Sequence, residues 1–258
     1  MPQNSRILIV DDDPVIAHLI STMLQKKGYV TAGIVETGEE AILKSADLAP
    51  DLIIMDVSLA GSMDGMDAAH YIFQLFHFPI IFITGIIEEE KLDRVKYSRP
   101  YGIIFKPFTM IEIATSINLA LYNHANRPGG QDRFPVGDPK TMMANTQEGV
   151  ILTDKRGRVI FCNTYAAWFV DLPPLQIMMK HWRDVFMIIN DQTGEEEQND
   201  FVAEAVRNMT ATILETNTGI VTTTSKRRKA RLSIRPIKDD HDRFLAVFIS
   251  IKEKIPHI

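Results

Sequence analysis

Five polar residues directly follow short apolar runs in the first half of the sequence. Two carboxylates end the first run, a third carboxylate ends a later run, and a hydroxyl and an ammonium end the last two; these residues are Asp11, Asp12, Asp56, Thr84 and Lys106. In open α/β sheets, ligands bind beyond the carboxyl ends of the strands. If the apolar runs are parallel strands, the five side chains meet in one shallow pocket.

This set of side chains suits phosphoryl transfer. Crowded carboxylates repel one another unless a cation is present, and Mg²⁺, which binds a few carboxylates and several waters, is the natural candidate. Held ionised in this way, Asp56 is predicted to attack phosphorus and form an aspartyl-phosphate. We expect Lys106 to offset charge on the transferring oxygens and Thr84 to hydrogen-bond the product phosphate.

The elements that must position these residues are short strands that alternate with helices. Continuous apolar runs of this length are typical of strands buried on both faces of a parallel sheet. The runs cover residues 7–10, 29–35, 52–55, 80–83 and 103–105. Strands that alternate with helical patterns predict a doubly wound α/β domain.

Two of the helices show clear signals. Asp13 and Pro14 are typical of a helix cap and the first helical position, and the helix is expected to stop at Gly28. The stripe expected to face the sheet consists of Val15, Ile16, Leu19, Ile20, Met23 and Leu24. Near the end of this half, Thr109 and Glu112 have the spacing of a capping box, and the apolar residues that follow are Ile113, Ile117 and Leu121.

Charge and composition divide the chain into two parts. Residues 1–124 contain 9 Lys and Arg against 16 Asp and Glu, a net charge of −7, whereas the remainder is +2. The stretch between them is rich in Pro, Gly and polar residues, as linkers are. A chain of 258 residues is long enough for two ordinary domains. We therefore predict one domain over 1–124, a linker over 125–139 and a second domain over 140–258.

Hydropathy and cysteine content indicate a soluble, cytoplasmic protein. The apolar runs are much shorter than the roughly 18 residues that a membrane span needs, and the N-terminus lacks the pattern of a signal peptide. The single cysteine, Cys162, has no second cysteine with which to form a disulfide or a thiolate metal site. We interpret it as a core residue.

The first half resembles the receiver domain of two-component response regulators. The motifs "ILIVDDDP", "DLIIMDVSL…MDGMDAA", "IIFITG" and "FKPF" carry this resemblance, which covers residues 5 to about 124. It implies a flavodoxin-like (βα)5 fold, a phosphoryl group accepted on Asp56 from a histidine kinase, and a cis Lys106–Pro107 peptide. It also implies Mg²⁺ bound by Asp11, Asp12, Asp56 and the backbone carbonyl of Ser58, with Thr84 as the switch hydroxyl and Lys106 as the conserved lysine.

The sequence departs from the family's usual pattern in two places. The loop "SLAGSMDG" is one residue longer than usual, and Ile103 stands where an aromatic residue is common. Two nearby acids are assigned to structure and not to the metal site. Asp13 precedes a proline and is read as a helix cap, whereas Asp64 precedes Gly65 and is read as a turn or helix start.

The second half predicts an α+β domain with an antiparallel sheet. Residues 149–163 contain two apolar runs around "DKRG", which indicates a hairpin. Helical stretches are expected at 164–170, 174–181 and 197–209. Three further strands are expected within 218–225, 229–237 and 243–251.

This half is similar to a PAS domain over about residues 140–253. The stretches that carry the similarity are "NTQEGVILTDKRGRVIFCNTYA", "WRDVFMII" and "RLSIRPIKDDHDRFLAVFISI". PAS domains sense small ligands, light or redox state, or serve as dimerisation and relay modules. The sequence favours the relay role, because neither Cys162 nor His181 belongs to a convergent polar set that would hold flavin or haem.

A basic run in this half has two interpretations. It comprises Lys226, Arg227, Arg228, Lys229, Arg231 and Arg235. Such a patch can neutralise nucleic-acid phosphates. However, Arg231 and Arg235 alternate with Leu232 and Ile234, which is typical of the solvated face of a half-buried strand. The sequence favours the second interpretation.

The sequence therefore predicts a cytoplasmic receiver–PAS response regulator that resembles those abundant in archaea. Its expected partners are a histidine kinase and a second copy of itself or another regulator. Its expected output is protein–protein interaction, which would regulate transcription indirectly. The alternatives are direct DNA binding by the hairpin 226–235 and an enzyme; for the enzyme, the only chemistry we expect is transfer and slow hydrolysis of its own phosphoryl group.

Overall fold

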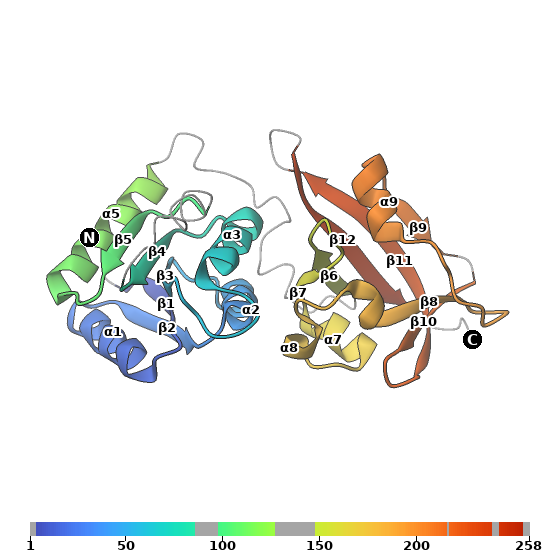
Figure 1. Cartoon of the computed structure of the whole chain (residues 1–258), viewed down its shortest axis with the longest axis horizontal. Coiled ribbons are helices and arrows are strands. Elements are labelled where there is room, and N and C mark those ends of the chain that lie inside the picture. Colours follow the sequence, from blue (N-terminus) through green and yellow to red (C-terminus); the bar gives the residue numbers. More distant parts are fainter. Residues whose placement is uncertain (1–3, 86–97, 127–147, 216, 239–242, 255–258) are drawn as a thin grey trace. The chain divides into compact units, whose positions relative to one another are not determined.

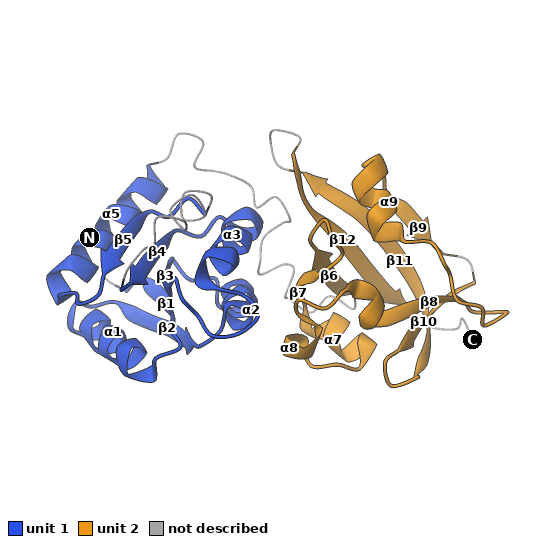
Figure 2. Ribbon diagram, in the orientation of Figure 1, with its two compact units in different colours: residues 1–139 blue, residues 140–258 orange. Residues whose placement is uncertain are grey.

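The computed structural model of the chain describes residues 4–85, 98–126, 148–215, 217–238 and 243–254. The chain divides into two compact units, residues 1–139 and residues 140–258 (Figure 2). From residue 127 on, the predicted linker lies outside the described residues. The two units are described separately.

The first unit alternates strands and helices along the chain. Its elements are β1 (Arg6–Val10), α1 (Pro14–Lys26), β2 (Val30–Val35), α2 (Gly38–Leu48), β3 (Leu52–Asp56), α3 (Gly65–Phe76), β4 (Ile80–Thr84), β5 (Gly102–Phe105) and α5 (Met110–Ala125). The five strands form one parallel sheet in the order β2-β1-β3-β4-β5. The five predicted strands are confirmed, and their bounds differ from the prediction by one residue at most.

Helices cover both faces of this sheet. Helices α1 and α5 lie on one face and α2 and α3 on the other (Figure 1). The core on the α1 and α5 side includes Ile9, Ile54, Ile83 and Ile104 from four strands. The central strands β1, β3 and β4 are covered on both sides and are almost continuously apolar until they end. The edge strands β2 and β5 are partly exposed. All five strands end at or just before polar residues at the same edge of the sheet.

Side-chain caps fix where these helices begin. Asp13 accepts a hydrogen bond from the backbone N–H of Val15 at 2.8 Å, and Asp64 accepts one from Asp67 at 2.9 Å. The capping box at α5 is confirmed in both directions, since Thr109 accepts from the N–H of Glu112 and the Glu112 carboxylate accepts from the N–H of Thr109. The assignment of Asp13 and Asp64 to helix caps is also confirmed.

The predicted apolar stripe of α1 was partly wrong. Val15 is 72% exposed and Leu19 is 43% exposed, whereas Ile20 and Leu24 are buried. At about 100° per residue, Val15 lies about 140° around the helix from Ile20 and Leu19 about 100°. The inward arc is completed instead by the small residue Ala17.

The second unit is built on an antiparallel sheet. Its elements are β6 (Gly149–Thr153), β7 (Val159–Cys162), α7 (Thr164–Val170), α8 (Pro174–Ile177), a 3-10 turn (Trp182–Asp184), β8 (Phe186–Asn190), α9 (Phe201–Asn208), β9 (Thr212–Leu214), β10 (Thr218–Thr222), β11 (Arg227–Lys238) and β12 (Phe244–Glu253). The strand order is β7-β6-β12-β11-β10-β8, and β9 pairs with β11. The predicted antiparallel α+β class is confirmed, as are the first hairpin and the three C-terminal strands.

Two predicted helices are shorter than expected. The predicted helix 174–181 ends at Ile177, because the chain then turns, with Met179 in the left-handed conformation, and joins β7. Met179 donates to the carbonyl of Val159, and Val159 donates to the carbonyl of Lys180. The predicted helix 197–209 is only α9, which begins after its cap, Asp200.

Two strands of this unit had not been predicted. In strand β8, Phe186 and Ile188 are buried and Met187 between them is exposed, as in a half-buried strand. No strand is predicted here from the sequence, because the segment directly follows a helical turn. Strand β9 has only three residues, which is too few for a periodic signal.

The described residues contain no helix that is both long and apolar enough to cross a lipid bilayer. The interpretation of Cys162 as a core residue is confirmed, since it is 1% exposed at the end of β7. Burial raises the pKa of its thiol to about 12. The thiol is therefore neutral throughout the range in which proteins are usually handled.

We predict that Cys162 does not react with iodoacetamide at pH 8 in the folded protein, because only a thiolate that solvent can reach is alkylated. Intact mass spectrometry should find no adduct on native protein and one adduct after unfolding in guanidinium. Rapid stoichiometric labelling of the native protein would contradict this.

Candidate functional site

The polar residues that follow the parallel strands converge at one edge of the sheet. Backbone hydrogen bonds continue the sheet past the strand ends: Val57 donates to the carbonyl of Ile83 at 3.3 Å, and Lys106 donates to the carbonyl of Thr84 at 2.8 Å. These bonds fix the backbone from which Asp56, Thr84 and Lys106 project. The side chains therefore start from a rigid frame.

The ammonium of Lys106 joins two of the carboxylates. Its Nζ donates to Oδ2 of Asp56 at 2.6 Å and to Oδ2 of Asp11 at 3.1 Å. The second oxygen of Asp56 accepts from the backbone N–H of Ser58 at 2.9 Å. The second oxygen of Asp11 accepts from the N–H of Asp13, also at 2.9 Å. Both carboxylates are thus oriented by hydrogen bonds to each of their oxygens.

Burial and the neighbouring charges shift the pKa values of Asp11 and Lys106 in opposite directions. Asp11 is 1% exposed, and this desolvation raises its pKa, although the N–H of Asp13 and the ammonium of Lys106 lower it in part. Burial alone would lower the pKa of Lys106, but the hydrogen bonds to Asp56 and Asp11 outweigh it, so the pKa is raised. Lys106 therefore remains charged, whereas the cost of burying the charge of Asp11 is not fully compensated.

The donor set fits a hard divalent cation. One carboxylate oxygen from each of Asp11, Asp12 and Asp56 lies within 4.8 Å of the others. Among the described residues, the ammonium of Lys106 contacts two of these three carboxylates, which leaves an excess of negative charge. Oxygen ligands at this density and with this charge are the ligands that Mg²⁺ prefers.

The remaining predicted site residues lie in different surroundings. Thr84 is 2% exposed at the end of β4, and Ser58 is exposed at the start of the loop that follows β3. Asp13 and Asp64 cap helices, as described above. The Lys106–Pro107 peptide is cis, as the resemblance implied. Ile103 is 37% exposed on β5.

Sequence reasoning missed the importance of Gly65 for this site. A Cβ atom at position 65 would lie 1.8 Å from the carbonyl oxygen of Asp56, and the N–H of Gly65 donates to the carbonyl of Val57 at 3.1 Å. The start of α3 thus packs directly against the backbone of Asp56. The Asp-Gly pair had signalled only a turn, because a close approach between distant backbones leaves no periodic pattern.

The longer loop after β3 is attached to α2. The hydroxyl of Ser62 donates to the carboxylate of Glu39, and Met63 is buried against Gly38 at the start of α2. The additional residue noted in the sequence is therefore part of a packed loop.

The basic run of the second unit is mostly engaged with groups of its own unit. Lys226 pairs with Asp171, Arg227 and Lys229 pair with Asp191, and Arg231 pairs with Glu215. The guanidinium groups of Arg228 and Arg235 lie over the rings of Trp168 and Phe248. Leu232 and Ile234 are buried, which confirms the interpretation of a solvated strand face.

Comparison with known proteins identifies two families in the chain. The family model of the response regulator receiver domain matches residues 7–118, and that of the PAS domain matches residues 147–253.

The relatives match the first unit. The phyllosphere-induced regulator PhyR of Methylorubrum extorquens is 31% identical over 119 residues, which cover 46% of this chain and 44% of that protein. The transcriptional regulatory protein PdtaR of Mycobacterium tuberculosis is 31% identical over 116 residues, which cover 45% of this chain and 56% of that protein. The chain thus spans about half the length of the curated relatives it matches. The solved receiver domain of a modulated diguanylate cyclase from Desulfovibrio desulfuricans G20 is 32% identical and covers 46% of this chain and 95% of that one, with a TM-score of 0.45.

We predict that Gly65→Ala destabilises the protein by about 1–3 kcal/mol, because the methyl group forces α3 away from the Asp56 carbonyl. Urea unfolding should measure the loss. Gly85→Ala is the matched control, since a Cβ there meets nothing within 4 Å. Equal stability of the two variants would contradict the close packing described here.

We predict that Asp11→Asn raises the free energy of unfolding at pH 7 without divalent cations, by on the order of 1 kcal/mol. Because the pKa of Asp11 is higher in the folded than in the unfolded protein, ionisation costs stability as pH rises above 3.8. The gain in the free energy of unfolding should therefore disappear near pH 3, where the side chain at position 11 is neutral in both the unmodified protein and the variant. Asp47→Asn, at an exposed position on α2, should show no such pH-dependent gain. If Asp11→Asn were less stable than the unmodified protein at pH 7, the ionised carboxylate of Asp11 would not be destabilising the folded state.

Proposed function

Because residues 7–118 form a response regulator receiver domain and residues 147–253 form a PAS domain, we propose that the protein is a two-component response regulator that accepts a phosphoryl group on Asp56. The group would come from a histidine kinase, and the PAS domain would pass the signal on through protein–protein contacts.

One observation carries the proposal. The carboxylate of Asp56 stands at the end of a buried strand, 2.6 Å from the ammonium of Lys106 and beside the carboxylates of Asp11 and Asp12. A buried carboxylate is costly unless cations offset its charge. The arrangement that offsets this charge also suits a phosphoryl group, whose oxygens are negative.

In the proposed transfer, one carboxylate oxygen of Asp56 bonds to phosphorus while the bond between phosphorus and the kinase histidine nitrogen breaks. The electron pair of the broken bond stays on that nitrogen. Lys106, already within hydrogen-bond distance of Asp56, would donate to an oxygen of the transferred group. The Thr84 hydroxyl would hydrogen-bond the product phosphate and so distinguish the modified state.

The receiver family and the donor set both support Mg²⁺ as the cofactor. Asp11, Asp12, Asp56 and the backbone carbonyl of Ser58 would hold it. When bound, it would offset charge on the phosphoryl oxygens as a Lewis acid.

The proposed chemistry is limited to the protein's own aspartate, so we expect no external metabolite as substrate. The carboxylate and aromatic partners of the basic run weaken the alternative of direct DNA binding through residues 226–235. A cytoplasmic location, a homodimer, an indirect effect on transcription and the archaeal type remain predictions from the sequence.

We predict that incubation with Mg²⁺ and acetyl phosphate adds the mass of one phosphoryl group, detected by intact mass spectrometry under mild conditions. EDTA should prevent the gain, and Asp56→Asn should abolish it. Asp64→Asn is the matched control and should retain it, since Asn also caps helices. A gain of the same size in Asp56→Asn would show that the acceptor is another residue.

A further inference from the structure

One face of the second unit's sheet carries an excess of positive charge. We call it the basic face and define it by the outward side chains of Arg227, Lys229, Arg231 and Arg235 on β11 and Lys252 on β12. All five are exposed. Their neighbours along β11, Ala230, Leu232 and Ile234, point to the opposite face and are buried. From Lys229 to Arg235 the strand thus places its cations on one face and its apolar residues on the other.

The basic face contains an unfavourable contact that folding alone does not explain. Arg231 and Lys252 are directly opposite each other across the antiparallel pair of β11 and β12. Like charges in this position destabilise a sheet. Such departures from local rules are expected where a surface serves binding.

The carboxylates already on this face do not balance it. Among the described residues, Asp191 is shared by Arg227 and Lys229, and Glu215 pairs with Arg231. The Arg231 and Glu215 side chains are each about half exposed, so this pair is solvated and readily exchanged. An incoming carboxylate can take the place of Glu215 at little cost.

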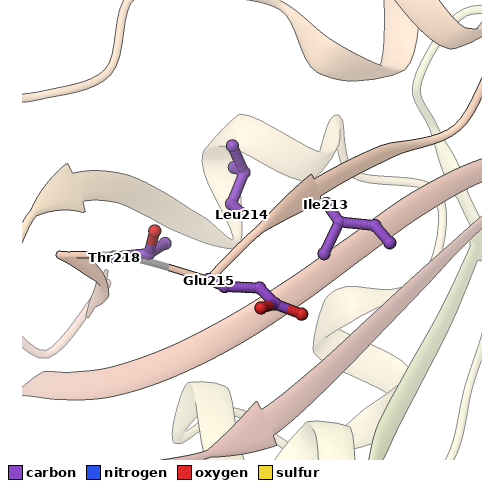
Figure 3. Close-up of a pocket in the computed structure, with 4 residues that line it drawn as sticks. All are labelled: Ile213, Leu214, Glu215 and Thr218. Atoms are coloured by element: carbon purple, nitrogen blue, oxygen red, sulfur yellow. The ribbon is translucent and has the colours of Figure 1, made fainter.

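Apolar groups lie within the same face. Ile213 on β9 is paired with Ser233 between the arginines and is 55% exposed, and Phe248 lies beneath the guanidinium of Arg235. Beside Ile213 an open hollow is lined by Ile213, Leu214, Glu215 and Thr218 (Figure 3). Figure 3 shows Ile213 and Glu215 projecting to one side of the strand and Leu214 to the other.

We propose that the basic face binds an acidic polypeptide segment of a partner protein, with its carboxylates on Lys229, Arg231 and Lys252 and an apolar side chain against Ile213. The proposal rests on the proposed function, because it identifies the surface through which the PAS domain would make its protein–protein contacts.

Two other occupants fit this face less well. A second copy, docked face to face, would bring two surfaces of the same excess charge together, which is repulsive. Nucleic acid would leave Ile213, which is 55% exposed, without an apolar partner. Arginine and aromatic groups together are typical of protein interfaces.

Binding can be tested on the full-length protein with fluorescein-labelled poly-L-glutamate as the probe. Fluorescence anisotropy should show binding at low salt that weakens at high salt. The variant Lys229→Glu/Arg231→Glu/Lys252→Glu should bind at least about tenfold more weakly. The matched control is Lys155→Glu/Arg156→Glu/Lys180→Glu, which changes the net charge equally at exposed positions away from this face, and it should bind nearly as well as the unmodified protein.

A single variant separates binding from folding. Lys252→Glu places a carboxylate opposite Arg231 and replaces repulsion by attraction, so its melting temperature should be equal or higher while its affinity for the probe falls. Asp56→Asn should bind the probe normally. The proposed phosphorylation is therefore tested by Asp56→Asn, and the proposed binding by the basic face is tested separately by Lys252→Glu.

Several results would overturn the proposal. These are no binding of the probe at low salt, equal losses in the two triple variants, and tighter binding of duplex DNA than of poly-glutamate with the same dependence on Lys252. Sedimentation that shows a dimer lost in Lys252→Glu would assign the face to a second copy instead.

Discussion

The site of the first unit depends most on the ion pairs that the ammonium of Lys106 makes with Asp56 and Asp11. This ammonium lies between two carboxylates that end buried strands, 2.6 Å from Asp56 and 3.1 Å from Asp11. Without a cation, two ionised groups at the end of an apolar sheet would be strongly unfavourable. Lys106 reduces this cost but cannot remove it, because Asp12 brings a third carboxylate to the same place. The folded unit thus retains an excess of negative charge at one point, which a divalent metal ion can offset.

The sheet explains how three distant segments meet at that point. Parallel strands end at the same edge, and backbone hydrogen bonds beyond the strand ends hold Asp56 and Lys106 in place. On the other side, α3 begins so close to Asp56 that only glycine fits at position 65. Asp56 is therefore placed by backbone packing and the ammonium of Lys106 by its side chain. Precision of this kind is what the proposed group transfer requires.

Much of this site could be predicted from the sequence, because the central strands are buried on both faces and their apolar runs stop where the polar site residues begin. The helix caps Asp13 and Asp64 could also be predicted, since a cap depends only on residues next to it in the sequence. The features that could not be predicted depend on contacts between distant segments. No local sequence signal near Met179 indicates that its backbone N–H will bond to β7 and so end helix α8. The exposure of Val15 depends on which arc of α1 meets the sheet, and Gly65 is critical only because Asp56 lies against it.

The two units handle charge in opposite ways. In the first, three carboxylates gather at one edge of the sheet and are partly neutralised by Lys106. In the second, β11 keeps its apolar residues inside and spreads its cations over an open face, where Arg231 and Lys252 repel each other across the sheet. A small cluster of convergent side chains selects a small group by geometry, whereas an open charged face selects a partner by complementarity over a wide area. The proposed transfer of a phosphoryl group in one unit and the proposed contact with proteins through the other would need both arrangements.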